Sequence, residues 1–300
     1  MLGYRGLQHL VSTAIRRLNL WPFVSKTEMY SRYRRRKYPD TIVQMDVVFT
    51  ECCTLRCRNC ANLMQYYHNP ENLDANVTVS ALKTLFNALR VSQLNILGGE
   101  PFVCQSELIR ILEYLKTEAD NKVDEIVVIT NGTIIPSDEC LQDLKDTPKL
   151  KVLFSNYGEL SSKMNEFTDI CARKGISYCI VDTEYWWDFG DLRCREEKAQ
   201  KVQKRYDACY SRRRCTTLYR GKLYVCPRQG HAIRLGILSE DVTETDDFSN
   251  PEFEDPKTLR DSIYMLTNQK EYITTCRYCE CDDRIRVHRA IQAERLVDVC

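Results

Sequence analysis

Three cysteines stand close together in the motif ECCTLRCRNCAN, where Cys53, Cys57 and Cys60 have the spacing C-x3-C-x2-C. Thiolates at this spacing can hold three irons of a four-iron cluster, which leaves the fourth iron without a protein ligand. An open iron can bind a small molecule and pass an electron to it, whereas a site closed by four protein ligands is structural. The sequence therefore predicts a reactive iron–sulfur cluster at this motif.

The motif follows a β-rich run, and from residue 42 to residue 182 such runs alternate with helical patterns. Apolar residues at i, i+3, i+4 and i+7 predict a helix capped by Thr78, a second around Leu108 and a third after Ser161. Strands that alternate with helices form a parallel sheet, and ligands bind at the carboxyl ends of its strands. The predicted strands are 42–49, 94–97, 125–130, 151–155 and 176–182.

Glycine and polar residues stand at the ends of three predicted strands: Gly98, Gly99 and Glu100 follow 94–97, Asn131 follows 125–130, and Ser155 ends 151–155. Together with the three cysteines, they resemble the radical S-adenosylmethionine (SAM) superfamily over about residues 42–182. The resemblance implies an α/β fold, a partial (βα)6 TIM-like barrel. It also implies a catalytic [4Fe-4S] cluster that reductively cleaves SAM to a 5′-deoxyadenosyl radical.

The resemblance assigns cofactor contacts to the strand ends. Gly98, Gly99 and Glu100 match the family motif that holds the SAM amino group, where glycine allows close backbone approach. Asn131 and Ser155 match positions that contact the SAM ribose and carboxylate. The sequence departs from the family at residue 59, because the residue before the third cysteine is usually aromatic there and packs near the adenine.

More cysteines follow in the last third of the chain. A turn at Gly221 in YRGKLYVCPR predicts a hairpin that delivers Cys226. This arrangement resembles the SPASM and Twitch extensions of radical SAM enzymes, which hold an auxiliary [4Fe-4S] cluster. The resemblance implies the ligand set Cys215, Cys226, Cys276 and Cys279, with Cys209 and Cys281 as surplus thiols and Cys209 as an alternative to Cys215. A structural zinc ion is a second interpretation of the same spacing.

The chain has 300 residues and 16 cysteines, and its net charge of +1 hides a basic N-terminal segment and an acidic stretch at residues 239–261. Neither a secretory signal nor a membrane span is predicted, so we expect a cytoplasmic protein with reduced thiols. The predicted domains are a basic helical arm at 1–40, the barrel at 41–200 and the auxiliary cluster domain at 201–300. The arm is expected either to pack on the barrel or to make peripheral contact with a membrane surface or an anionic ligand.

The aromatic run 185–189 follows the last predicted strand, where stacking and hydrogen bonds would suit a sugar-like or other small polar substrate. The resemblance implies dehydrogenation or epimerisation of such a substrate, with hydrogen returned in the second case by a surplus thiol (Cys104, Cys194, Cys209 or Cys281). It also implies an electron donor such as flavodoxin or ferredoxin. The alternatives are a peptide- or protein-modifying maturase, for which 41 residues before the first strand leave little room for a precursor-binding domain, and a noncatalytic metal-binding scaffold whose basic arm binds nucleic acid.

Overall fold

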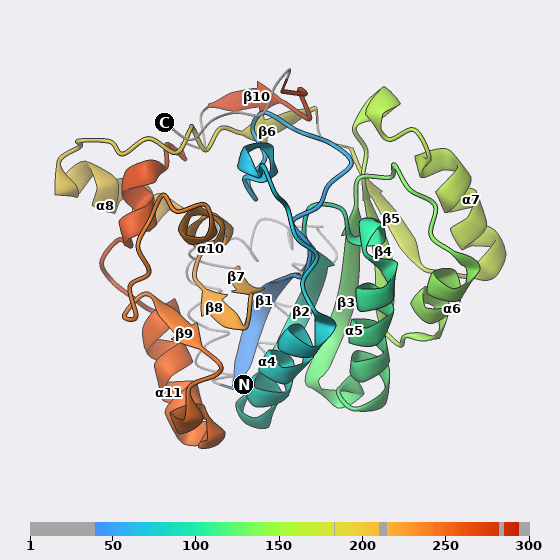
Figure 1. The fold of residues 1–300 in the computed structure, drawn as a ribbon, viewed down its shortest axis with the longest axis horizontal. Helices are drawn as coiled ribbons and strands as arrows, with labels where there is room; N and C mark the ends of the chain where they lie inside the picture. Colours follow the sequence, from blue (N-terminus) through green and yellow to red (C-terminus); the bar gives the residue numbers. More distant parts are fainter. Residues whose placement is uncertain (1–39, 183, 210–214, 282–284, 294–300) are drawn as a thin grey trace, which may run out of the picture. The chain divides into compact units, whose positions relative to one another are not determined.

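Eight strands of the described residues form one continuous sheet in this computed structural model (Figure 1). The structure describes residues 40–182, 184–209, 215–281 and 285–293, so the predicted arm lies outside it except for Asp40. Across the sheet the strands follow the order β5-β4-β3-β2-β1-β7-β8-β9. Their bounds are β1 (Thr41–Val48), β2 (Arg90–Leu97), β3 (Val123–Thr130), β4 (Leu150–Ser155), β5 (Tyr178–Val181), β7 (Thr216–Tyr219), β8 (Lys222–Tyr224) and β9 (Thr245–Asp247).

The first five strands match the five predicted ones. β2, β3, β4 and β5 pair in parallel, and β1 pairs in parallel with β7. Among the described strands the sheet ends at β5 instead of closing on itself. These features confirm the α/β class and the open, partial barrel. β2 begins at Arg90, before its predicted start at residue 94. The prediction missed these residues because polar Gln93 interrupts the apolar pattern; in the strand its side chain bonds to that of Asn95.

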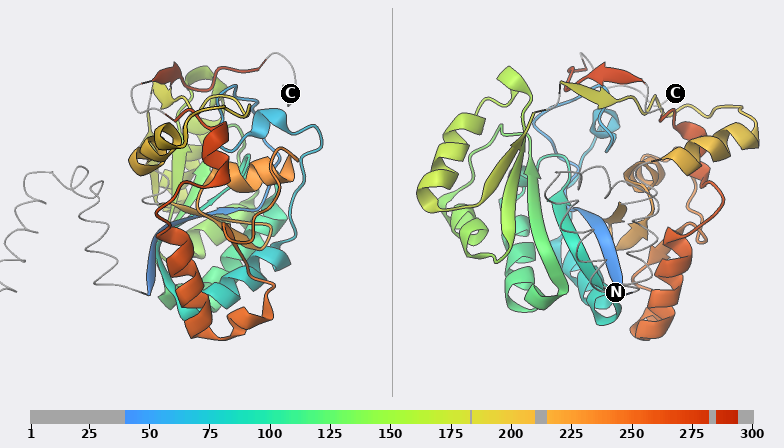
Figure 2. Two further views of the ribbon diagram at one scale, coloured as in Figure 1. Left: turned by 90° about the vertical axis from the view of Figure 1, so that its left-hand side faces the viewer. Right: turned by 180° about the vertical axis from the view of Figure 1, so that it is seen from behind.

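Four helices pack on the sheet between successive strands: α4 (Ala75–Ala88), α5 (Gln105–Thr117), α6 (Asp138–Asp146) and α7 (Met164–Lys174) (Figures 1 and 2). The prediction that Thr78 caps the first of them is wrong, because the Asp74 side chain accepts from Asn76 N and starts the helix earlier. Short α6, capped by Ser137, was not predicted from its few apolar residues. Apolar side chains of these helices and of the strands share one large core, which fixes the strand ends.

The C-terminal third continues the sheet. β7 and β8 form the predicted hairpin, and its turn residues Arg220 and Gly221 have φ of 52° and 76°. Antiparallel β9 follows, so the acidic stretch 239–261 contains a strand and the start of α11 (Pro256–Thr267). Leu218 of β7 and Leu259 of α11 belong to the same core as the first four strands. The sheet therefore shows no break at the predicted domain boundary near residue 200.

The remaining elements lie outside the main sheet. β6 (Tyr185–Trp187) pairs antiparallel with β10 (Arg286–His288) in a separate two-stranded sheet, at the top of Figure 1. No helix among the described residues is long and apolar enough to cross a membrane. The other helices are α8 (Ala199–Ala208), α10 (Pro227–Arg234) and the 3-10 turns η1 (Met64–Tyr66), η2 (Pro101–Val103), η3 (Asp120–Lys122), η4 (Gly158–Leu160), η5 (Pro251–Glu254) and η6 (Thr274–Tyr278).

Candidate iron–sulfur and SAM site

The loop that carries the first three cysteines leaves β1 and packs against the end of β2. Gly99 N donates to Thr50 O and Glu100 N donates to Cys52 O, each over 2.8 Å. A Cβ atom at Gly98 would lie 2.3 Å from the Thr50 carbonyl oxygen, and one at Gly99 would lie 2.1 Å from that of Cys52. Residues with a side chain cannot approach so closely. The glycine pair thus allows the cysteine loop to rest on β2.

Cys53, Cys57 and Cys60 line one cavity of about 160 Å³. Burial, together with the charge of an ionised Cys60, raises the pKa of the Cys53 and Cys57 thiols to about 12. Three thiolates here therefore oppose each other's ionisation, and a bound cation would reverse that balance. Among the described residues that form the wall, no fourth cysteine, histidine or carboxylate is present. This donor set fits a cluster with one iron left open.

The cavity also brings together four of the five residues predicted to contact SAM, namely Gly98, Gly99, Asn131 and Ser155. Asn131 links the end of β3 to the cysteine loop, because its Nδ2 donates to Thr54 Oγ1 over 3.1 Å and lies 3.7 Å from Cys53 Sγ. The carboxyl ends of β2, β3 and β4 therefore face the three thiols, as expected for a parallel sheet.

Glu100, the fifth predicted residue, is fully buried. Its carboxylate accepts hydrogen bonds from Thr130 Oγ1 (2.8 Å), Asn131 N (2.8 Å) and Phe102 N (3.3 Å). Burial raises the pKa of this carboxyl to about 7, although the three donors oppose the rise. Glu100 thus joins the ends of β2 and β3, and its contact with a cofactor stays a prediction.

Aromatic residues that the motifs did not single out complete the cavity. Tyr157, just after β4, and Trp186 of β6 both line it, and their rings meet edge to face at 5.4 Å. Asn59, which stands where an aromatic residue is usual, donates instead to Asp188 Oδ1 over 3.3 Å. The only sequence signal for Trp186 was the aromatic run, and Tyr157 gave none beyond following a strand end.

Five cysteines form a second group: Cys209, Cys226, Cys276, Cys279 and Cys281. Burial, together with the charges of ionised Cys209 and Cys279, raises the pKa of Cys226 to about 12. Burial also raises the pKa of Cys276, and Cys226, Cys209 and Cys279 add to this rise. Cys281 shares a hydrogen bond with Cys209. Three of the four predicted auxiliary ligands are therefore neighbours of each other and of Cys209.

Cys215, the fourth predicted auxiliary ligand, stands just before β7. Its Sγ donates to Asp46 Oδ2 over 2.9 Å, and Asn95 Nδ2 donates to the other oxygen of that carboxylate over 2.7 Å. Burial raises the pKa of both Cys215 and Asp46. The Cys215 thiol is therefore engaged with β1, although Cys226 also raises its pKa. Cys209 interacts with Cys276 and Cys279, and the choice between Cys209 and Cys215 as a ligand stays a prediction.

Arg228 connects the two groups of cysteines. It is 3% exposed, and its Nη2 lies within 3.3 Å of the carbonyl oxygens of Gly190, Asp191 and Tyr278. Within the described part of the chain, Arg228 forms no ion pair. Its charge lowers the pKa of Cys60 on one side and of Cys226 and Cys279 on the other, against the larger effect of burial. A buried cation therefore stands near both groups.

A chain of buried polar groups lies beneath the first cysteine loop. Tyr67 Oη lies 2.8 Å from His231 Nδ1 and 3.3 Å from Tyr219 Oη, which donates to Glu51. Arg220 Nη2 donates to Glu51 over 2.7 Å. Burial, followed by the charge of Arg220, lowers the pKa of His231 to about 3. The sequence gave no role to this lone histidine, which helps to join α10 and β7 to the residue just before the cysteines.

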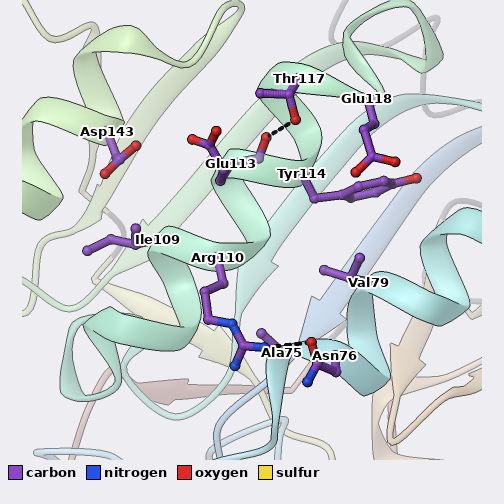
Figure 3. A pocket seen from close by; sticks show the side chains of 10 residues that line it. All are labelled: Ala75, Asn76, Val79, Ile109, Arg110, Glu113, Tyr114, Thr117, Glu118 and Asp143. Carbon is purple, nitrogen blue, oxygen red and sulfur yellow. Dashed lines mark hydrogen bonds between the residues drawn. The ribbon is translucent and has the colours of Figure 1, made fainter.

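A larger hollow of about 490 Å³ lies elsewhere, on the outer surface of α4 and α5 (Figure 3). Charged and polar side chains surround it, and Arg110 Nη2 bonds to Asn76 Oδ1 across it. None of the predicted site residues lines it, and its position away from the strand ends separates it from the cysteines. Among the described residues, no three His, Cys, Asp or Glu side chains converge on a position suited to a single metal ion.

Comparison with known proteins agrees with the geometry of the first cysteine loop. Residues 47–155 match the radical SAM superfamily. This range begins near the end of β1 and ends with β4, so it includes the three cysteines, the glycine pair and the strand ends that line the cavity. A search of curated proteins found no match.

Three solved structures align with parts of this chain, and one of them reaches a TM-score of 0.50. BtrN in complex with AdoMet and 2-DOIA aligns with 86% of this chain and 98% of its own, at 13% identity and a TM-score of 0.50. SuiB of Streptococcus suis bound to S-adenosylmethionine aligns with 74% of this chain and 67% of its own, at 12% identity and a TM-score of 0.43. For anSMEcpe with AdoMet and the Cp18Cys peptide the identity is 19% and the TM-score 0.38, over 47% of this chain and 42% of its own. This chain thus spans less than half of anSMEcpe.

Proposed function

Because residues 47–155 are a radical SAM domain, we propose that this chain is an enzyme that cleaves SAM reductively and abstracts hydrogen from a small polar or carbohydrate-like substrate. The bound cluster and SAM would supply a 5′-deoxyadenosyl radical, and the substrate would then be dehydrogenated or epimerised. The observation that carries this proposal is the single cavity that holds three thiols, no fourth ligand among its described residues, and the ends of three strands.

The chain's own residues would hold the cofactors in this cavity. Cys53, Cys57 and Cys60 would bind three irons, while Gly98 and Gly99, which line the same cavity, would present backbone to the methionine part of SAM. The amide of Asn131 and the hydroxyl of Ser155 can bond to polar groups of the cofactor, since both side chains lie on the cavity wall. Glu100 would act from behind this wall by fixing the backbone of Asn131.

The second group of cysteines would bind an auxiliary [4Fe-4S] cluster. Closely placed buried thiols that raise each other's pKa favour a cationic occupant. The geometry supports Cys209, Cys226, Cys276 and Cys279 as its ligands, with Cys209 in the place first assigned to Cys215. Cys281, which bonds to Cys209, would then be the surplus thiol nearest to this cluster.

The substrate class rests on the aromatic wall. Trp186 and Tyr157 present rings to the cavity beside the thiols, and aromatic faces of this kind stack on sugar rings and other flat polar molecules. The structure of BtrN was solved with a small molecule, 2-DOIA, and its fold extends over most of this chain. An electron donor such as flavodoxin or ferredoxin in the cytoplasm, where thiols stay reduced, completes the proposal.

The test is SAM cleavage by the anaerobically reconstituted protein. With dithionite and SAM, we expect release of 5′-deoxyadenosine and about eight irons per chain, as two four-iron clusters require. Cys57→Ala should reduce the release to the buffer background. Cys226→Ala, the matched control in the second group, should still cleave SAM. An iron-loaded wild-type protein that leaves SAM intact would contradict the proposal. Deuterium transfer from candidate sugars into 5′-deoxyadenosine would then identify the substrate.

A further inference from the structure

The last described residues of the chain pair with the catalytic cysteine loop. Arg58 N donates to Ile291 O over 2.7 Å, and Ala293 N donates to Arg56 O over 2.8 Å. Between these two bonds, Cys57 and Gln292 face each other in an antiparallel bridge. Residues more than 230 positions apart thus form a small ladder, and the loop that carries the thiols is held from the C-terminal side.

The side-chain amide of Gln292 is held through both its oxygen and its nitrogen. Its Oε1 accepts from Arg56 N over 2.8 Å, and its Nε2 donates to Ala290 O over 2.7 Å. The same Nε2 also lies 3.3 Å from Cys57 Sγ and donates to it. An amide that is bonded through both its oxygen and its nitrogen has little rotational freedom, so this amide is preorganised toward the sulfur.

The segment that presents Gln292 is itself anchored. β10, which ends at His288, pairs with β6, and Arg289 N donates to Glu184 O over 3.0 Å. β6 contributes Trp186 to the wall of the same cavity. The position of Gln292 is therefore set by the two-stranded sheet that covers the strand ends.

We propose that Gln292 is a positioning residue that raises the reduction potential of the catalytic cluster by donating an amide hydrogen to the sulfur of Cys57. This inference rests on the proposed function, in which Cys57 binds an iron. Hydrogen bonds to cluster sulfurs withdraw negative charge from them, which favours the reduced state. The cluster gains one electron from the external donor, and Gln292 itself neither gains nor loses an electron or a proton.

Two variants of Gln292 test the bond to Cys57. Gln292→Glu keeps an oxygen that can accept from Arg56 N, but it replaces the nitrogen that donates to Cys57 Sγ and Ala290 O with a second, negatively charged oxygen. Gln292→Met has a similar length and loses all three side-chain bonds. Ile291→Gln is the matched control, because the Ile291 side chain is 43% exposed and its carbonyl oxygen can still accept from Arg58 N.

The measurement is a redox titration of the reconstituted holoenzyme followed by electron paramagnetic resonance, in which the catalytic cluster is identified by the change in its signal when SAM binds. At the wild-type midpoint, Gln292→Glu should raise the oxidised-to-reduced ratio about tenfold, or about 59 mV for one electron. Gln292→Met should lower the midpoint potential by less than Gln292→Glu does, and Ile291→Gln should leave it unchanged.

The proposal would be overturned if the catalytic cluster had the wild-type midpoint potential in both Gln292 variants. Loss of the catalytic cluster from both, with the cluster retained in Ile291→Gln, would also overturn it, because Gln292 would then hold the loop together without tuning the potential. A wild-type protein with no SAM-responsive signal would instead contradict the proposed function, so the two failures are distinguishable.

Discussion

The two groups of cysteines are built in opposite ways. Cys53, Cys57 and Cys60 come from one short loop, and two of their sulfurs receive hydrogen bonds from side chains of distant elements, Asn131 and Gln292. The second group comes from several segments: the end of α8, the start of α10, η6 and the residues after η6. In this group the bonds to sulfur named above come from the group's own members: Cys281 N donates to Cys279 Sγ over 3.4 Å, and Cys281 shares a hydrogen bond with Cys209.

This difference teaches how each site is held. The first loop is held by contacts with the protein itself, namely its bonds to the end of β2 and the bridge to Gln292. The second site joins segments that are far apart in sequence, so a bound cluster would itself supply part of their attachment. Loss of a cysteine should therefore affect the two sites differently.

The largest effect is expected for the choice of auxiliary ligand. Cys209→Ala should lower the iron content from about eight to about four per chain, because it removes a thiolate from the second cluster. Cys215→Ala is the matched variant, and it should keep about eight irons because its thiol bonds to Asp46. Iron and sulfide analysis of the two reconstituted proteins measures this. The opposite pattern would restore Cys215 as a ligand.

A smaller effect, but one shared by the two sites, is expected from Arg228. Arg228→Gln removes a buried positive charge near both groups, which disfavours the reduced states and should lower both midpoint potentials by about 59 mV or less, a tenfold ratio for one electron. Arg205→Gln is the control, because Arg205 donates to Cys276 O and its charge is partly offset by Glu197.

The two redox titrations decide whether the sites share this charge. Arg205→Gln should change the auxiliary potential alone, and by less than Arg228→Gln does. Arg228→Lys keeps the charge and should stay close to the wild type. If Arg228→Gln changed the midpoint potential of only one cluster, the charge of Arg228 would act on that site alone.

The contrast between the sites also explains what the sequence could predict. The first site is local: its three cysteines share one motif, and its remaining residues stand at the ends of strands that apolar runs define. In a parallel sheet the carboxyl ends of neighbouring strands lie at the same edge. The amino-acid sequence alone was therefore enough to predict that Gly98, Asn131 and Ser155 lie beside the thiols.

The second site could be predicted only in part. The hairpin at Gly221 places Cys226 by local turn geometry, and the structure confirms that turn. The choice between Cys209 and Cys215 depends instead on the pairing of β7 with β1, which puts Cys215 beside Asp46. That pairing joins segments that are far apart in the chain, and no spacing rule encodes it.

Contacts that join distant segments through single side chains were not predicted at all. Gln292 stands in no motif, and Arg228 ends the hairpin segment YRGKLYVCPR without a predicted role; their partners are mostly backbone carbonyl and amide groups. Burial of His231 gave no signal either, because α10 has polar residues on the face that it buries.

The smallest effect concerns the buried polar groups beneath the first loop, which have no described counterpart at the second. Burial lowers the pKa of His231 to about 3 in the folded protein, from an ordinary value of 6.5. Between these values the unfolded chain binds a proton and the folded protein does not, so the free energy of unfolding should fall as the pH drops from about 6.5. The slope is at most about 1.4 kcal/mol for each pH unit.

His231→Asn tests this, because an asparagine oxygen can accept from Tyr67 Oη but does not titrate in this range. The variant should lose less stability between about pH 7 and about pH 5 than the wild type, as measured by thermal unfolding at each pH. Tyr67→Phe removes the hydrogen-bond partner but leaves the histidine buried, so it should keep the wild-type acid dependence. Acid lability of the clusters is common to all three proteins, so it cannot produce a difference between them. If His231→Asn and the wild type lost equal stability with falling pH, the titration of His231 would not contribute to the acid dependence.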